Sequence, residues 1–228
     1  MARKPRVVVA GAPHHVYLRG NNRRRLFTTN EERWLWLRCL ERGIRASTCA
    51  LHQLTLMTNH VHLIVTPTDP KALSKLVKRA CQRFAQLRNA ELEASGKLFE
   101  ERFQSKVITD DAHCMMTTLY NDANGFRAGL VEEPLAHEWS TGPLHAASGR
   151  SNVPRSMWTP SPWYLRLGTT KSARASAYRQ LMTAYTLRDQ QQVAEREHRD
   201  LGTYRRRIER PDGMSAREPE TQWLRKTV

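Results

Sequence analysis

Four stretches of the chain are predicted to be β-strands, residues 48–57 by their β-type composition and the others by apolar residues at alternating positions. They are residues 15–19, 48–57, 58–65 and 98–109. Two longer stretches, 31–46 and 71–93, repeat apolar residues at the spacing of an amphipathic helix. The order strand, helix, strand, strand, helix, strand predicts an α+β fold with a ferredoxin-like split βαβ antiparallel sheet. Both helices then cover one face of the sheet, and the other face is left to be covered or used.

Turn and capping residues predict where these elements end. Gly20-Asn21-Asn22 follows the first strand and has strong turn chemistry. Asn30 is a plausible N-cap for the first helix, because two glutamates follow it in the first turn. Thr58-Asn59 makes a short link between the second and third strands, which are therefore expected to pair as a hairpin.

A third helix is predicted from Asp111 to Asn124. Thr109-Asp110-Asp111 is a good helix start, and Gly125 is a natural stop. On this helix Tyr120 and Asn124 are four positions apart and so lie on one face. A helical tyrosine is usually buried with its hydroxyl satisfied, so the position of Tyr120 alone does not indicate chemistry.

The composition changes after Val131. Residues 132–163 are rich in Pro, Gly, Ser and His, and we expect an irregular segment that is held on the core by its tryptophans. Two helices are expected after it, at residues 171–187 and 189–198. The sequence therefore predicts two domains, a core of residues 1–131 and an extension of residues 132–228, which is irregular, then helical, with a basic tail.

The charge balance points to a polyanionic partner. Lysine and arginine total 37 against 22 aspartates and glutamates, giving a formal net charge of +15 and a pI near 10.3. Charge of this size is most often met in nucleic-acid-binding proteins, although a generically basic surface that aids solubility remains open. Hydrophobic residues make up 39% of the chain, which is enough for a core, so wholesale disorder is not expected.

Signals for a membrane or for secretion are missing from the pattern. No run of eighteen apolar residues occurs, and no secretory leader precedes the four scattered cysteines. Cys49 and His52 have a ligand-like spacing, but no second pair of ligands accompanies them, so a zinc site is not expected either. We expect no membrane association, and a reduced, intracellular protein located in the cytoplasm with the nucleoid.

His60 and His62 are the main candidates for chemistry. On a strand they project from the same face, with Cα atoms about 7 Å apart. Two neighbouring imidazoles are half of a metal site, and the amide oxygen of Asn124 could add a ligand, with water in the remaining positions. Mixed nitrogen and oxygen ligands suit magnesium or manganese. The plainer alternative is a generic DNA- or RNA-binding module in which both are satisfied core histidines.

Several separated stretches resemble the REP-associated tyrosine transposases, which are single-tyrosine transposases of the H-hydrophobic-H (HUH) superfamily. Residues 14–23 (HHVYLRGNNR) resemble the family's opening strand and its R-G-N-N turn. Residues 57–65 (MTNHVHLIV) resemble its metal strand. Tyr120, Asn124 and residues 127–131 (RAGLV) resemble its nucleophile helix.

The resemblance continues beyond these motifs. Residues 158–168 (WTPSPWYLRLG) and 177–179 (AYR) resemble the family's C-terminal segment, so the likeness covers most of residues 14–188. Three positions depart from the family pattern and remove no implied catalytic group. They are Thr58 for proline, Gly125-Phe126 for Pro-Val, and Phe99-Glu100-Glu101 for Trp-x-Gly.

The resemblance implies a specific activity. Tyr120 is the implied nucleophile, and the implied ligands of a divalent ion, Mg²⁺ or Mn²⁺, are His60, His62 and Asn124. Such enzymes cleave single-stranded DNA near the foot of imperfect palindromic hairpins, leave a 5′-phosphotyrosine link and a free 3′-hydroxyl, and can join strands again. No nucleotide cofactor is needed, because the covalent link keeps the bond energy.

The implied partner is single-stranded DNA with hairpin repeats, bound by a monomer or a homodimer. Arg19, Asn21 and Arg23 are the expected DNA contacts, although the arginines after the first strand also suit a solvated turn. Arg127 either contacts phosphate or caps the last carbonyls of the nucleophile helix. The run Arg205-Arg206-Arg207 is expected to add salt-sensitive, sequence-blind affinity. The alternative function is a non-catalytic protein that binds DNA hairpins and retains the transposase fold.

Overall fold

The structure, a computed structural model, describes residues 7–100 and 102–208. Within these ranges, side chains are described up to residue 193 and at residue 195. The predicted DNA contacts of the arginines at 205–207 therefore lie outside the described side chains.

Contacts between residues divide the chain into two compact units. One ends at Thr186 and contains the sheet, both candidate histidines and Tyr120. The other begins at Leu187, within the C-terminal helix. The functional boundary after Val131 stays a prediction.

Four antiparallel strands form one sheet in the order β2-β3-β1-β4. The strands are β1 (His14–Arg19), β2 (Cys49–Leu56), β3 (His60–Pro67) and β4 (Gln104–Val107). Two helices connect them along the chain, α1 (Asn30–Arg45) after β1 and α2 (Ala72–Glu91) after β3. This topology confirms the predicted ferredoxin-like α+β fold, with β3 and β1 at the centre.

The fourth strand is shorter than the predicted stretch of residues 98–109. Phe99 forms only an isolated bridge with Gly20, and Glu100 donates its backbone N–H to the carbonyl of Arg19. A continuous ladder with β1 begins at Gln104, which pairs with Tyr17.

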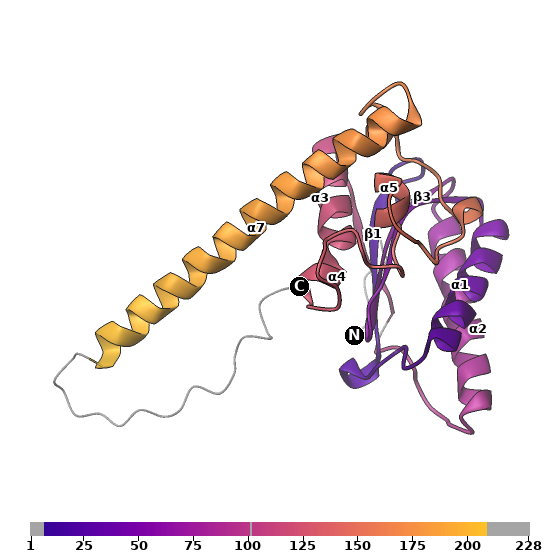
Figure 1. Ribbon diagram of the computed structural model, residues 1–228. Helices are drawn as coiled ribbons and strands as arrows, with labels where there is room; N and C mark the ends of the chain where they lie inside the picture. The colour runs from indigo at the N-terminus through magenta and orange to yellow at the C-terminus, as the bar shows by residue number, and fades with distance from the viewer. Residues whose placement is uncertain (1–6, 101, 209–228) are drawn as a thin grey trace. The chain divides into compact units, whose positions relative to one another are not determined.

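The two faces of the sheet differ in chemistry. One face presents apolar side chains such as Val16 and Leu63, which join Trp36 of α1 and Phe84 of α2 in the main core. Figure 1 shows α1 and α2 on this side of the sheet and α3 (Asp111–Asp122) on the other. Because alternate residues face opposite ways, His60 and its neighbours at every second position face α3's side.

Thr29, and not Asn30, is the N-cap of α1. The Thr29 hydroxyl accepts a hydrogen bond from the backbone of Glu32, and the Glu32 carboxylate accepts one from the backbone of Thr29. The prediction of Asn30 was wrong because this capping box requires the acidic residue three positions after the cap. Glu32 also accepts a 2.6 Å bond from Arg88 Nε, which ties α1 to α2.

Exposed arginines form two rows on the helical layer. Arg38 and Arg42 lie one turn apart on α1, and Arg79 and Arg83 lie one turn apart on α2. A groove of about 290 Å³ between the helices is lined by three of them. None of the four forms an ion pair within the described part of the chain. Like charges at this spacing repel each other.

The helix that carries Tyr120 ends earlier than predicted. Asp110 caps α3 by accepting a 2.8 Å hydrogen bond from the backbone of His113. The helix ends at Asp122, and Asn124 begins a separate turn, α4 (Asn124–Arg127). The prediction of a helix through Asn124 was wrong because Ala123, with ψ −7°, departs from the ψ of about −42° that an α-helix requires.

The segment of residues 132–163 is largely irregular, as predicted, and its tryptophans are buried. Its short helices are α5 (Gly142–Ala146), η2 (Arg155–Met157) and α6 (Pro162–Leu165), and the long helix α7 (Lys171–Ile208) follows it. Trp139 joins the main core, whereas Trp158 and Trp163 join a second core with Leu119 of α3.

One continuous helix, α7, replaces the two helices predicted at residues 171–187 and 189–198. The predicted break was wrong because Arg188, between them, is a good helix former, and no glycine or proline stands there. No helix in the described residues is long and apolar enough to cross a bilayer.

Candidate active site on the polar face of the sheet

His60 and His62 project from β3 on the sheet face opposite α1 and α2. Across from them on β1, Arg19 pairs with His60 and Tyr17 pairs with His62. His15, two residues before Tyr17, stacks on His62 with ring centroids 5.2 Å apart. Tyr17 lies between the candidate ligands, with its ring 5.5 Å from that of His60 and 5.1 Å from that of His62. We call His15, Tyr17, His60 and His62 the histidine cluster.

Each candidate ligand is oriented through its Nδ1 atom. His60 Nδ1 lies 2.7 Å from Asn59 Oδ1, and His62 Nδ1 lies 3.0 Å from His15 Nε2. Neither His60 Nε2 nor His62 Nε2 has a hydrogen-bond partner among the described residues. Metal-binding histidines are held in this way, with one ring nitrogen fixed by a neighbour and the other left for the ion. The two rings are 5.0 Å apart.

The protein keeps these imidazoles neutral. Burial, followed by the charge of Arg19, lowers the pKa of His60 to about 4. Burial, followed by repulsion from His60 and His15, holds the pKa of His62 well below its usual value. Burial, followed by the charge of Lys106, lowers the pKa of His15 to about 4. Neutral imidazoles have a lone pair available for a metal ion.

Tyr120 is half-buried beside the histidine cluster and is not sealed in the core. Its ring lies edge-on to that of His62, with centroids 6.2 Å apart. The guanidinium of Arg127 lies over the Tyr120 ring, 4.8 Å from its centroid. The Tyr120 hydroxyl has no hydrogen bond within the described residues. The structure therefore brings the predicted nucleophile close to the histidine pair, and it places the positively charged guanidinium of Arg127 over the tyrosine ring.

Asn124 lies at the start of α4 and is only 8% exposed. Its Nδ2 atom is buried and has no hydrogen-bond partner among the described residues. The side chain makes no hydrogen bond with His60 or His62 in that part of the chain. A buried polar group without a partner is unusual, and this N–H group is available to donate to a ligand oxygen, whereas a metal ion would be bound through Oδ1.

Local packing explains why a glycine stands at position 125. A Cβ atom at this position would lie 2.7 Å from His137 Cγ, which is closer than such atoms approach. His137 comes from the irregular segment, and its Nε2 lies 2.9 Å from the carbonyl oxygen of Leu56. The glycine that replaces the family's proline therefore makes room for a buried histidine beside Asn124.

The three predicted DNA contacts lie at the end of β1. Arg19 stacks over Tyr17, 5.1 Å from the ring centroid, and donates from Nε to the Tyr17 hydroxyl. Asn21 and Arg23 bound a short 3₁₀ turn, η1 (Asn21–Arg23). The carbonyl oxygen of Arg23 accepts a 3.2 Å bond from Asn59 Nδ2, and Asn59 in turn orients His60. The turn is thus linked to the histidine pair, while DNA contact by these side chains stays a prediction.

Sequence reasoning did not select His15 and Tyr17 as site residues. They alternate with Arg19 along β1, so the period-two rule that grouped His60 with His62 could have found them.

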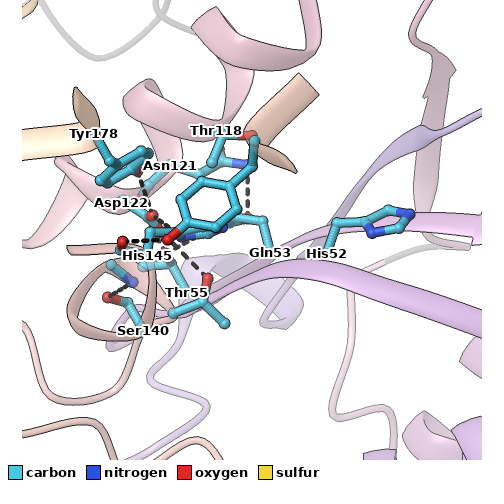
Figure 2. Close-up of polar contacts among 12 residues, drawn as sticks. His52, Gln53, Thr55, Thr118, Asn121, Asp122, Ser140, His145 and Tyr178 are labelled. Carbon is cyan, nitrogen blue, oxygen red and sulfur yellow. Dashed lines mark hydrogen bonds and ion pairs between the residues drawn. The ribbon is translucent and has the colours of Figure 1, made fainter. Parts of the chain in front are cut away.

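Sequence reasoning also missed a buried group of polar side chains beside α3, which we call the aspartate cluster. Figure 2 shows its members, Gln53, Asn121, Asp122, His145 and Tyr178. They come from distant parts of the chain, so no spacing rule joins them.

The donor set fits a divalent ion that takes mixed ligands. Among the described residues, no group of three or more His, Cys, Asp or Glu side chains could hold a metal ion. The predicted donors are the Nε2 atoms of His60 and His62, which have no partner among the described residues, and the amide oxygen of Asn124, and together they would leave positions for water and a phosphate oxygen. Such a set suits Mg²⁺ or Mn²⁺.

Topology and site together define a class: an α+β protein with a ferredoxin-like sheet whose polar face carries paired histidines beside a helical tyrosine. A family profile described as "Transposase IS200 like" matches residues 9–120, a segment that ends at Tyr120. Over residues 9–120 the chain is thus similar to the IS200-like transposases.

One solved structure shares this fold. A REP-associated tyrosine transposase bound to a REP hairpin matches with a TM-score of 0.55 and 17% identity, over 71% of this chain and 93% of that one. A putative transposase from Deinococcus radiodurans R1 matches with a TM-score of 0.36 and 17% identity, over 51% of this chain and 93% of that one. At these identities the first likeness shows the fold alone, and the second carries no argument. No curated protein matches the chain.

Proposed function

We propose that this protein cleaves and rejoins single-stranded DNA at palindromic repeat hairpins through a 5′-phosphotyrosine on Tyr120. The observation that carries the proposal is the half-exposed Tyr120 ring between His62 and the Arg127 guanidinium. Hairpin DNA as the substrate is supported by the REP hairpin bound to the solved relative and by the net charge of +15. The protein would act on DNA in the cytoplasm, as a monomer or a homodimer.

Cleavage exchanges one phosphoester for another. Tyr120 Oη attacks the phosphorus, the bond from phosphorus to the 3′-oxygen breaks, and the tyrosine is left esterified to the 5′-phosphate. The phenolic proton leaves to solvent, and the 3′-oxygen takes up a proton. The Arg127 guanidinium over the ring stabilises the negative charge on the phenol. Attack by a 3′-hydroxyl reverses these steps and joins the strands, so no nucleotide cofactor is consumed.

His60, His62 and Asn124 would hold the divalent ion, which polarises the phosphodiester when it is bound. Asn59 and His15 orient the two imidazoles through their Nδ1 atoms. Arg19, Asn21 and Arg23, at the end of β1, hold the phosphates that flank the cleaved bond.

Two tyrosines flank His62, and a paired substitution distinguishes them. Tyr120→Phe should abolish the denaturation-resistant adduct that forms with single-stranded hairpin DNA and Mn²⁺. Tyr17→Phe should still form it, because the Tyr17 hydroxyl is engaged by Arg19 and burial raises the Tyr17 pKa. The measurement is gel separation of labelled DNA after denaturation.

Each other outcome has a defined meaning. An adduct that survives in Tyr120→Phe and is lost in Tyr17→Phe would move the nucleophile to β1. Tight hairpin binding with no adduct in the unmodified protein would establish the non-catalytic alternative. Gly125 does not favour that alternative, because the packing of His137 accounts for a glycine at this position.

A further inference from the structure

Asp122 lies on α3 two residues after Tyr120, and its carboxylate is completely buried. Its Oδ2 accepts a 2.7 Å bond from the Tyr178 hydroxyl and a 2.8 Å bond from His145 Nδ1. Its Oδ1 accepts a 2.9 Å bond from Gln53 Nε2 and a longer, 3.4 Å bond from Thr141 Oγ1. The three shorter bonds come from β2, α5 and α7 (Figure 2). One position of α3 is therefore tied to three other elements.

The side of α3 from which the Asp122 side chain projects determines how its hydrogen bonds affect Tyr120. Successive residues of an α-helix are rotated by about 100°, so side chains two positions apart project about 200° apart. Tyr120 and Asp122 therefore leave opposite sides of α3. Bonds that fix Asp122 set the rotation of the helix about its axis, and this rotation decides where the Tyr120 ring points.

A second link joins α3 to the strands that carry the histidines. Asn121 donates from Nδ2 to Gln53 Oε1 at 2.9 Å, and its backbone carbonyl accepts a 2.9 Å bond from Thr55 Oγ1. Thr55 pairs directly with His62 in the sheet. The Tyr120 ring and the His62 ring are thus positioned through one short chain of contacts.

The remaining contacts of the aspartate cluster show how tightly it is enclosed. The His145 ring stacks on that of Tyr178 at 4.9 Å and meets Trp158 edge-on at 5.2 Å. His145 and Tyr178 are both 0% exposed. In such surroundings a lost hydrogen bond is not replaced by water, so the carboxylate must find a new position.

We infer that Asp122, held by Tyr178 and His145, is a positioning residue that sets Tyr120 against the histidine pair. The inference rests on the proposed role of Tyr120 as the nucleophile. It also means that the chain beyond the matched segment 9–120 is needed for cleavage, because three of the four donors to Asp122 lie there.

The test compares two tyrosines of the same enclosed region. Tyr178→Phe removes the donor to Asp122, whereas Tyr164→Phe removes a 2.7 Å bond to the backbone carbonyl of His145. At saturating hairpin DNA and Mn²⁺, Tyr178→Phe should slow single-turnover adduct formation by about 10- to 100-fold, since small misplacement of a reacting group has effects of this size. Tyr164→Phe should stay within about threefold at a similar loss of thermal stability. Hairpin affinity should be unchanged in both.

Equal slowing by both variants, or no slowing by Tyr178→Phe, would overturn the inference. If Tyr178→Phe does not fold, Thr55→Val removes the hydroxyl that bonds Asn121 and replaces it in the comparison. The nuclear Overhauser contact between the His62 and Tyr120 rings provides a readout without activity, and it should weaken only in the positioning variant. An unmodified protein that forms no adduct would refute the proposed function, while this ring contact would still decide the positioning role.

Discussion

The histidine cluster and the aspartate cluster lie on the same side of the sheet, yet they use polar groups in opposite ways. In the aspartate cluster, both carboxylate oxygens of Asp122 accept hydrogen bonds and the donors are fully buried. In the histidine cluster, two Nε2 atoms have no partner among the described residues, and a half-exposed phenol stands beside them. Two atoms of the aspartate cluster, His145 Nε2 and Asn121 Oδ1, are also buried without a partner among the described residues, so the difference lies in the enclosed, hydrogen-bonded carboxylate of Asp122. A buried carboxylate that accepts several hydrogen bonds holds a fold, whereas groups at a partly exposed site that are held without partners are suited to chemistry. Substitutions in the two clusters should therefore affect different quantities.

The largest expected effect on stability is that of Asp122→Ala. The substitution removes the acceptor of four buried donors, from Gln53, Thr141, His145 and Tyr178, so the free energy of unfolding should fall by about 3–5 kcal/mol. Tyr120→Phe, which breaks no hydrogen bond, should change it by less than about 0.5 kcal/mol. Urea denaturation followed by circular dichroism measures both. Equal losses would mean that the two clusters do not differ as described.

Two histidines on neighbouring strands, His62 on β3 and His52 on β2, should affect metal affinity and stability in opposite ways. His62→Ala should lower Mn²⁺ affinity more than about tenfold, because it removes a ligand. His52→Ala, on β2, should leave that affinity unchanged but cost about 1–3 kcal/mol of stability, since both His52 nitrogens have partners in Thr66 and Thr159. Isothermal calorimetry with Mn²⁺ and thermal unfolding give the two values. Loss of Mn²⁺ binding in His52→Ala would place the ion elsewhere.

Gly125 and His137 form a pair that can be tested by a double-mutant cycle. Gly125→Ala should destabilise the protein by about 1–3 kcal/mol, because the added methyl group meets the His137 ring. In a His137→Ala background the same change should cost at least about 1 kcal/mol less, since the obstacle is gone. Additive effects would show that the ring does not limit this position.

The smallest expected effect is on the pH dependence of stability. Burial lowers the pKa of His137, which therefore takes up a proton more readily in the unfolded chain than in the folded one. Its contribution to stability is complete above the unfolded pKa of about 6.5 and is lost as the pH falls from there towards the folded value. His137→Gln should flatten the decline in unfolding free energy over that range. An unchanged slope would show that His137 is protonated in the folded protein as well.

Local patterns predicted the sheet and one half of the site. The alternation in β3 places His60 and His62 on one face without any knowledge of neighbours, because a strand's period is a property of the backbone. The end of α3 could not be predicted in the same way, since its Asp122 is held by His145 and Tyr178, 23 and 56 residues further along. Gly125 resembled a helix stop in the sequence, and only the position of His137 supplies its cause.

The arginine rows on α1 and α2 have a practical consequence for handling the protein. Raising the ionic strength from about 0.01 to 0.15 M shortens the Debye length from about 30 to 8 Å and weakens the repulsion within each row. The ligand-free protein should therefore be more stable during storage at the higher ionic strength. The same electrolyte displaces a polyanion from a cationic surface, so the buffer that suits storage is the wrong one for assays with nucleic acid.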